Sequence, residues 1–203
     1  MPVVTAIKKQ KRQGRANIYL DGEFAFGTDL ETLFKNHLKI NQDLSQSEIN
    51  KIKNATDYQS TLNKLLNFAT LRPRSYREIS NWFWKKKTPD NYQKKLIKKL
   101  EKLELLDDEK FATWWVGQRQ TFRPRSRRQL QAELIQKGID KKIINNILED
   151  SNINEVQIAK NLIKKNAYKW DRFDEKKRVQ KMSEYLGRKG FNWEVIKKAI
   201  TSE

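Results

Sequence analysis

Apolar residues recur at helical spacing along most of the chain. After residue 126 they return every three or four positions and are interrupted by Lys137-Gly138, a pair typical of a helix end with glycine in left-handed backbone. The same order of helix, turn and helix returns around Lys189-Gly190. In the earlier part of the chain, the lysine-rich segment 85–93 stands in place of the glycine turn. The pattern predicts pairs of amphipathic helices repeated along the chain.

The first 28 residues follow a different pattern. Segments 3–7 and 16–20 are rich in residues that favour strands, and Gln13-Gly14 supplies a turn between them. Asp21-Gly22, followed by the apolar segment 23–27, is a strong signal for a two-residue hairpin. These residues predict a small three-stranded meander, which needs a covering element to be stable.

Two helices are expected after the meander. Residues 29–40 carry apolar side chains at helical spacing and would form an amphipathic helix that covers the strands. Residues 45–48 read Ser-Gln-Ser-Glu, the pattern of a capping box, and predict the start of another helix that runs through Ile52.

An eight-residue segment occurs twice. Residues 72–79 read Arg-Pro-Arg-Ser-Tyr-Arg-Glu-Ile and residues 123–130 read Arg-Pro-Arg-Ser-Arg-Arg-Gln-Leu, identical at five of eight positions. In each copy a serine, Ser75 or Ser126, is followed three residues later by Glu or Gln, which predicts a helix N-cap with a capping box. The proline two residues before the serine suits the extended chain that enters such a helix. Each segment therefore predicts a corner between two helices.

The corners divide the chain into units of about fifty residues. We expect an N-terminal part at 1–56 with the strands and two helices, followed by three-helix units at 57–106, 107–153 and 154–203. The third unit lacks the Arg-Pro-Arg-Ser segment, and its second helix is expected to start at Asp174. The predicted fold is mainly α: a curved array of tandem three-helix units with a small N-terminal β-meander.

Charge is the strongest compositional signal. The 203 residues include 43 Lys and Arg against 25 Asp and Glu, a net charge of +18. A surplus of this size is typical of proteins that bind polyanions such as nucleic acids. The chain has no cysteine, and no apolar segment approaches the ~20 residues that span a bilayer. We therefore expect a cytoplasmic protein that makes no contact with a membrane.

The sequence offers no set of residues for catalysis. It has a single histidine, His37, no cysteine nucleophile and no glycine-rich phosphate loop. The densest acidic cluster, Asp107-Asp108-Glu109, would suit a metal-dependent nuclease, but acidic residues at a helix start are also favoured by capping and by the helix dipole. We weigh this structural explanation well above a metal site. No catalytic residue, metal ligand or cofactor is predicted.

Basic residues gather at the corners and turns. Arginine can bind phosphate through two parallel hydrogen bonds, and helix N-termini attract anions. A run of charge is often only a solvated surface, but the repetition of these arginines favours contact with phosphate or with an acidic partner. The candidate binding residues are Arg72, Arg74, Arg77, Arg123, Arg125, Arg127, Arg128, Lys137, Arg188 and Lys189.

The chain also has six tryptophans, which are able to stack on nucleic-acid bases. Several fall at helical spacing with other apolar residues, which favours a place in the core for most of them. They are Trp82, Trp84, Trp114, Trp115, Trp170 and Trp193.

Several short motifs follow one another over nearly the whole chain. They are the hairpin 17–27, the Arg-Pro-Arg-Ser corner, 106–108 with Phe111-Ala112 and Trp115-Val116, Glu133-Leu134 with 137–139, and 188–191. In this order they resemble the RecX family of bacterial recombination regulators, although the turn 85–93 is longer than the commoner form. The resemblance implies tandem three-helix units and a role without catalysis. It also implies binding in the groove of the RecA recombinase filament, with some affinity for DNA.

We therefore expect a monomeric, non-enzymatic modulator of RecA, and more specifically an inhibitor, that binds along the RecA–DNA filament. It would bind single- and double-stranded DNA weakly and without sequence preference. The alternative is an autonomous DNA- or RNA-binding helical module, which a sequence preference retained without RecA would favour. A metal-dependent nuclease that uses Asp107 and Asp108 is a third reading, and divalent-ion-dependent cleavage would favour it.

Overall fold

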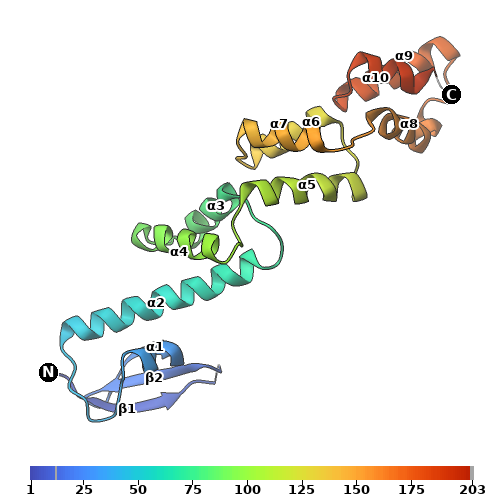
Figure 1. The fold of residues 1–203 in the computed structure, drawn as a ribbon. Coiled ribbons are helices and arrows are strands. Elements are labelled where there is room, and N and C mark those ends of the chain that lie inside the picture. The colour runs from blue at the N-terminus through green and yellow to red at the C-terminus, as the bar shows by residue number, and fades with distance from the viewer. Residues whose placement is uncertain (12, 202–203) are drawn as a thin grey trace. The chain divides into compact units, whose positions relative to one another are not determined.

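A computed structural model describes residues 1–11 and 13–201 of the chain. Within these residues the fold is mainly helical, with a small antiparallel sheet near the N-terminus (Figure 1). The predicted fold class, helical units together with an N-terminal β-meander, is confirmed.

The sheet is the predicted meander. Strands β1 (Val4–Lys9), β2 (Arg15–Leu20) and β3 (Glu23–Asp29) pair in the order β1-β2-β3, each antiparallel to the next. The hairpin between β2 and β3 turns at Asp21 and Gly22, both with positive φ, as an Asp-Gly hairpin requires.

Helix α1 (Leu30–Lys35) is much shorter than the predicted helix over 29–40. The Asn36 side chain donates a hydrogen bond to the Thr32 carbonyl oxygen, and His37 takes left-handed backbone with φ of +49°, so the helix ends there. Phe34, which the periodic pattern assigned to the covering face, is 69% exposed. The prediction was therefore wrong beyond Lys35.

Helix α2 (Gln46–Ala69) begins at the predicted Ser45 N-cap, where both halves of the capping box are formed. The sequence suggested one helix here and another after residue 57, but the backbone continues without a break. Thr56, a polar residue in the middle, is buried and shares a 2.8 Å hydrogen bond with Thr28 of β3. This bond satisfies both hydroxyls, so the apolar face of the helix continues across residue 57.

The sheet and the first half of α2 share a hydrophobic core. The meander is too small to bury its own apolar face, and α2 covers it together with Leu33 of α1. The buried residues are Val4, Ile18, Phe26, Leu38, Leu44, Ile49 and Ile52.

The chain divides into two compact units. The first holds residues 1–72 and 88–100, and the second holds residues 73–87 and those from 101 onwards. The helices expected at 57–106 are therefore shared between the two compact units.

Helices α3 (Tyr76–Lys86) and α4 (Asp90–Lys102) flank the long turn that replaces the Lys-Gly pair. Helix α3 starts at Ser75, the predicted N-cap. It ends at Lys87, which adopts the left-handed backbone (φ of +50°) that glycine adopts at the end of a helix.

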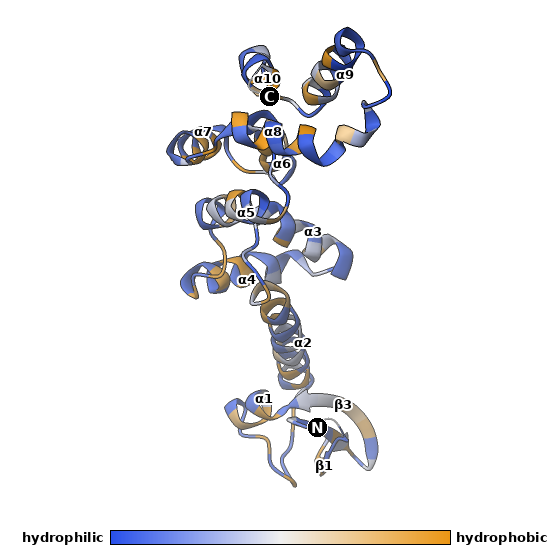
Figure 2. Cartoon of the chain, turned by 90° about the vertical axis from the view of Figure 1, so that its right-hand side faces the viewer, coloured by the Kyte–Doolittle hydropathy of each residue, from blue (hydrophilic) through white to orange (hydrophobic). Residues whose placement is uncertain are grey.

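The remaining helices of the second compact unit form two successive groups of three. Ser126 is an N-cap, as predicted, and the N-caps of three other helices are Asp107, Asn154 and Asp174. Figure 2 shows apolar and polar residues alternating along them, as in amphipathic helices. The helices are α5 (Asp108–Phe122), α6 (Arg127–Gln136), α7 (Lys141–Asp150), α8 (Glu155–Asn166), α9 (Glu175–Arg188) and α10 (Trp193–Ile200), with a 3-10 turn at Ala167–Lys169.

One hydrophobic core joins these helices. It runs from Phe111 in α5 to Ala199 in α10 and includes fully buried residues of α6, such as Leu130 and Leu134. The two groups of three helices therefore share a core and do not form separate small cores.

Candidate functional site

Each repeated serine joins two helix ends. The Ser75 hydroxyl accepts the N–H three residues further on, as an N-cap does, and donates to the Lys137 carbonyl oxygen at 2.8 Å. The Ser126 hydroxyl likewise caps α6 and donates to the Lys189 carbonyl oxygen at 2.7 Å. Both serines are fully buried. Because the last carbonyls of a helix have no partner within it, each serine satisfies the end of a helix in the following group.

The glycines after these lysines are pressed against the preceding corner. Gly138 and Gly190 have φ of +81° and +80°, as the predicted left-handed turns require. A Cβ on Gly138 would lie 2.8 Å from the Arg77 Cβ, and one on Gly190 would lie 2.9 Å from the Ser126 Oγ. The Lys-Gly turn is therefore both a helix end and a packing surface.

Asp107 and Asp108, in the acidic cluster at the start of α5, accept hydrogen bonds from backbone N–H groups. Asp107 accepts the backbone N–H groups of Glu109 and Lys110 at 2.8 and 3.0 Å. Asp108 accepts the Tyr76 N–H at 3.0 Å, which ties α5 to the first corner. Among the described residues, no three His, Asp or Glu side chains are grouped in a way that could hold a metal ion.

Glu155 in α8 repeats the role of Asp108. Its carboxylate accepts the Arg127 N–H at 2.9 Å, so the second corner is tied to the following helix in the same manner as the first. A carboxylate at the first position of a helix is also favoured by the helix dipole.

Two groups near the first corner have shifted pKa values. Burial raises the pKa of the Asp108 carboxyl, the Tyr76 N–H partly offsets this, and the nearby Asp107 adds to it. A 2.6 Å hydrogen bond to Glu101, with burial second, raises the pKa of the Tyr76 hydroxyl to about 12.

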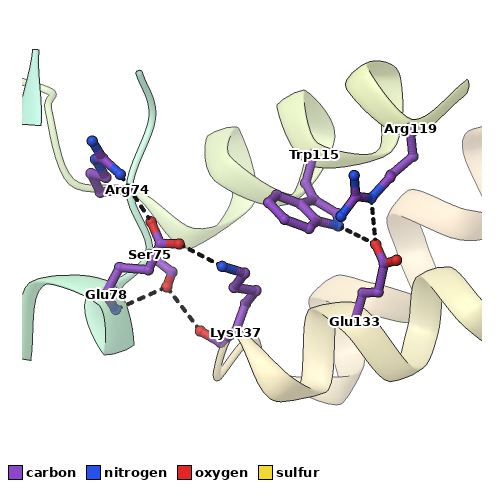
Figure 3. Close-up of polar contacts among 7 residues, drawn as sticks. All are labelled: Arg74, Ser75, Glu78, Trp115, Arg119, Glu133 and Lys137. Carbon is purple, nitrogen blue, oxygen red and sulfur yellow. Dashed lines mark hydrogen bonds and ion pairs between the residues drawn. The ribbon is translucent and has the colours of Figure 1, made fainter. Parts of the chain in front are cut away.

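Two of the predicted binding residues meet at a carboxylate inside the protein. Lys137 Nζ lies 2.7 Å from Glu78, and an Arg74 guanidinium nitrogen lies 3.7 Å from the same carboxylate (Figure 3). Arg74 is buried, with 8% of its surface exposed. Both cations therefore serve the joint between α3 and α6.

A second carboxylate, Glu133 of α6, collects groups from α5. It accepts hydrogen bonds from Trp115 Nε1 at 2.8 Å and Arg119 Nε at 2.7 Å (Figure 3). Arg125 Nε lies 3.8 Å from it, and Lys137 Nζ lies 4.7 Å from the centre of the Trp115 ring. The two carboxylates and their partners form a continuous polar network between the helices.

Arg127 is also engaged within the protein. Its guanidinium donates to the Leu148 carbonyl oxygen at the end of α7 and to the Ser151 carbonyl oxygen at 3.2 Å. It therefore closes a helix C-terminus, where cations are favoured.

The other predicted residues are more open to solvent. Arg72 and Lys189 are half-buried, and the Lys189 amine lies 5.7 Å from the centre of the Tyr185 ring. The exposed ones are Arg77, Arg123, Arg128 and Arg188. The structure thus divides the ten predicted residues into cations that hold helices together and cations that face solvent.

The second corner also borders a groove of about 350 Å³. One side is formed by the end of α5 and the corner, and the other by α8. The lining residues are Phe122, Arg123, Pro124, Arg125, Ile158, Asn161, Leu162 and Lys165. Phe122 is 72% exposed, which is unusual for a phenylalanine beside a hydrophobic core.

Most of the six tryptophans belong to the core, as predicted. The buried or half-buried ones are Trp82, Trp114, Trp115 and Trp170. Trp84 and Trp193 are 80% and 67% exposed. No helix in the described part of the chain combines the length and the apolar character needed to cross a bilayer.

Models of three RecX domains match this chain. The RecX N-terminal domain matches residues 2–45, the second RecX three-helix domain matches 107–148, and the third matches 154–200. The regulatory protein RecX of Bacillus velezensis is 32% identical over 202 residues, with 98% of this chain and 77% of that protein covered. The chain belongs to the RecX family. Its Bacillus subtilis relative is 31% identical over 206 residues, with 98% and 76% covered.

Solved RecX structures agree with the fold. A crystal structure of regulatory protein RecX superposes with a TM-score of 0.75 at 26% identity and covers 99% of this chain and 100% of that one. RecX from Lactobacillus salivarius superposes with a TM-score of 0.64 at 23% identity, covering 73% of this chain and 97% of that one. The RecX domains matched at 107–148 and 154–200 each contain one of the Lys-Gly turns that receive a serine hydroxyl.

One residue of this RecX-family chain escaped the prediction from sequence. Phe122 directly precedes the second Arg-Pro-Arg-Ser segment, and Leu71 directly precedes the first. They are 72% and 78% exposed. Extending the repeat by one residue would have revealed an apolar residue at both corners, which is the signal that could have found Phe122.

Proposed function

We propose that this RecX-family protein is a non-enzymatic modulator, and specifically an inhibitor, of the RecA recombinase. In this proposal it acts in the cytoplasm as a monomer and lies along the groove of the RecA–DNA filament. The resemblance of its motifs to the RecX family, and its membership in that family, support the choice of partner.

The proposal rests on the difference between the cations that are engaged between helices and those that are exposed to solvent. Arg123, Arg128 and Arg188 are exposed on helices and corners that share one hydrophobic core. Because that core and the serine joints fix the corners, these arginines keep a constant spacing. A constant spacing of positive charge suits a partner with a regular lattice of phosphates or acidic side chains. The net charge of +18 would also accelerate encounter with such a partner.

The division also changes which residues are proposed to bind. Arg74, Arg127 and Lys137 are engaged in joints, so we assign them to holding the corners in place. Arg123, Arg128 and Arg188 are assigned to direct contact with the filament.

The test is RecA-catalysed ATP hydrolysis on single-stranded DNA with this protein titrated in, at two salt concentrations and with DNA both limiting and in excess. We expect hydrolysis to fall at amounts far too small to coat the DNA. An effect that needs saturated DNA and disappears steeply with salt would instead support the autonomous nucleic-acid-binding module.

Two triple variants then locate the contact. The first replaces Arg123, Arg128 and Arg188 with Glu, and the control replaces Lys9, Lys39 and Lys51, also exposed, with Glu. Both change the net charge equally, so general steering is weakened to the same extent. We expect the first variant to need about ten times more protein for the same inhibition, and the control much less. Equal losses in two folded variants would overturn the assignment of the contact to these arginines.

A further inference from the structure

The groove beside the second corner has an apolar floor and a cationic rim. The floor is formed by Phe122, Ile158 and Leu162. The Phe122 ring is largely exposed, so one face of an aromatic side chain is open to an occupant. A stacked ring would remove that face from water.

The rim favours an anionic occupant. Arg123 and Lys165 are exposed, while Arg125 lies 3.8 Å from Glu133 and is partly neutralised by it. Asn161 adds an amide that can both donate and accept a hydrogen bond. The groove therefore suits a ligand with a flat apolar part, a polar edge and a nearby negative charge.

The size of the groove limits the choice of occupant. About 350 Å³ is near the lower limit for small-molecule sites. A docked amphipathic helix would need a longer surface, because its anchoring side chains extend over two turns or about 10 Å. A single nucleotide meets the requirement, since its base is flat, the base edge forms hydrogen bonds, and its phosphate lies beside it.

We propose that this groove binds one unpaired nucleotide of a single-stranded nucleic acid. The base stacks on Phe122, and the phosphates on either side are held by Arg123 and Lys165. A paired base in a duplex cannot present its face in this way, so the site selects single strands. The inference is independent of any action on RecA, because it needs no recombinase.

The chain itself supplies a way to close the groove. Counting from their N-caps, Asp107 and Asn154, helices α5 and α8 have Trp115 and Leu162 at the same position. Leu162→Trp therefore keeps an apolar side chain at this lining position of the groove and, because an indole is larger than the leucine side chain, reduces the volume of the groove.

The experiment measures binding of the full chain, without RecA, to fluorescent oligo(dT) of 15 nucleotides and to an oligonucleotide of the same length made of abasic sites. The abasic strand has the same phosphates but no bases, so it reports the electrostatic part alone. Phe122→Ala should weaken oligo(dT) binding about fivefold or more and leave abasic binding unchanged. Phe122→Trp should bind oligo(dT) at least as well as the wild type, and Leu162→Trp should lose binding as Phe122→Ala does.

Phe34→Ala is the matched control, since Phe34 is 69% exposed and Phe122 is 72% exposed. It should bind both oligonucleotides as the wild type does. The inference fails if Phe122→Ala binds oligo(dT) within twofold of the wild type, or if it loses the same factor on the abasic strand. It also fails if Phe122→Ala weakens only binding to the RecA filament, since the occupant would then be a protein side chain. The ATP hydrolysis measured with wild-type protein decides the proposed function separately.

Discussion

Ser126 and Ser45 are both helix N-caps, but only Ser126 also donates a hydrogen bond to a distant carbonyl oxygen, that of Lys189. Replacing Ser45 with Ala should cost about 1 kcal/mol of stability, as for an ordinary cap. Replacing Ser126 with Ala should cost about 2 to 4 kcal/mol, because it also leaves a carbonyl oxygen without its donor in a buried site. Urea unfolding followed by circular dichroism measures both, and equal losses would contradict the joint.

Arg127 and Arg128 are neighbours in the repeated segment, yet they differ in role. The Arg127 guanidinium donates to two carbonyl oxygens at the end of α7, whereas Arg128 is exposed. Arg127→Lys should lower the unfolding free energy by about 1.5 to 3 kcal/mol, because an ammonium group cannot match the planar fork. Arg128→Lys should leave it unchanged within about 0.5 kcal/mol. The two variants differ by one position, which makes each a control for the other.

Asp108 gives a prediction about pH. Burial raises its pKa in the folded protein above the ordinary value of 3.8, so its contribution to stability is fully present below that value and is lost as pH rises through the folded-state pKa. Asp108→Asn keeps an oxygen that accepts the Tyr76 N–H but has no charge to bury. Above that window the variant should be at least as stable as the wild type. Its unfolding free energy should also lack this part of the pH dependence, which begins near pH 3.8 and ends above the folded-state pKa.

Local spacing was enough to predict the caps at Ser75 and Ser126, because an N-cap depends on residues three positions away. It was not enough to predict where the serine hydroxyls donate, because Lys137 and Lys189 lie 62 and 63 positions further on. For the same reason the sequence could not separate inward arginines from outward ones. Their chemistry is identical, and the difference comes from the carboxylates and carbonyl oxygens that the fold brings to them.

The turns between elements of secondary structure show the effect of packing as well as that of backbone conformation. Gly14 and Gly190 have nearly the same φ, +77° and +80°, but a Cβ on Gly14 would meet nothing within 4 Å. A Cβ on Gly190 would lie 2.9 Å from the Ser126 Oγ. Gly14→Ala should therefore cost only the strain of left-handed backbone, about 1 kcal/mol, and Gly190→Ala clearly more. Thermal unfolding compares them, and similar losses would mean that the corner yields easily.

The errors in the prediction also arose at the level of helices. The periodic pattern extended α1 too far, because Leu38 is buried in the core although it lies outside the helix, and the pattern does not register the left-handed backbone at His37. The repeat also placed a unit boundary at residue 57, whereas α2 runs through it with Thr56 buried and bonded to Thr28 of β3. This second error depends on a contact between elements, which no local window contains.

Considered as a whole, the molecule should bind nucleic acid in a strongly salt-dependent manner. For single strands the slope of log affinity against log salt is about −0.7 for each phosphate contact. Replacing Arg123, Arg128 and Arg188 with Ala should therefore reduce the slope by about 2 if all three contact phosphates. The control, Lys9, Lys39 and Lys51 replaced with Ala, should change it less. Fluorescence anisotropy at four or more salt concentrations gives the slope, and an unchanged slope would exclude these arginines from the contact.

The serine joints also set an order of events in the cell. Ser126 leaves the ribosome 63 residues before the carbonyl group that it will bind. At bacterial rates of about 5 to 20 residues per second, the second corner waits roughly 3 to 13 seconds for its partner. Ser75 waits a similar time for Lys137, 62 residues later. The two serine hydrogen bonds can therefore form only in order from the N-terminus. Each group of helices must be synthesised before the serine of the preceding group can donate to it.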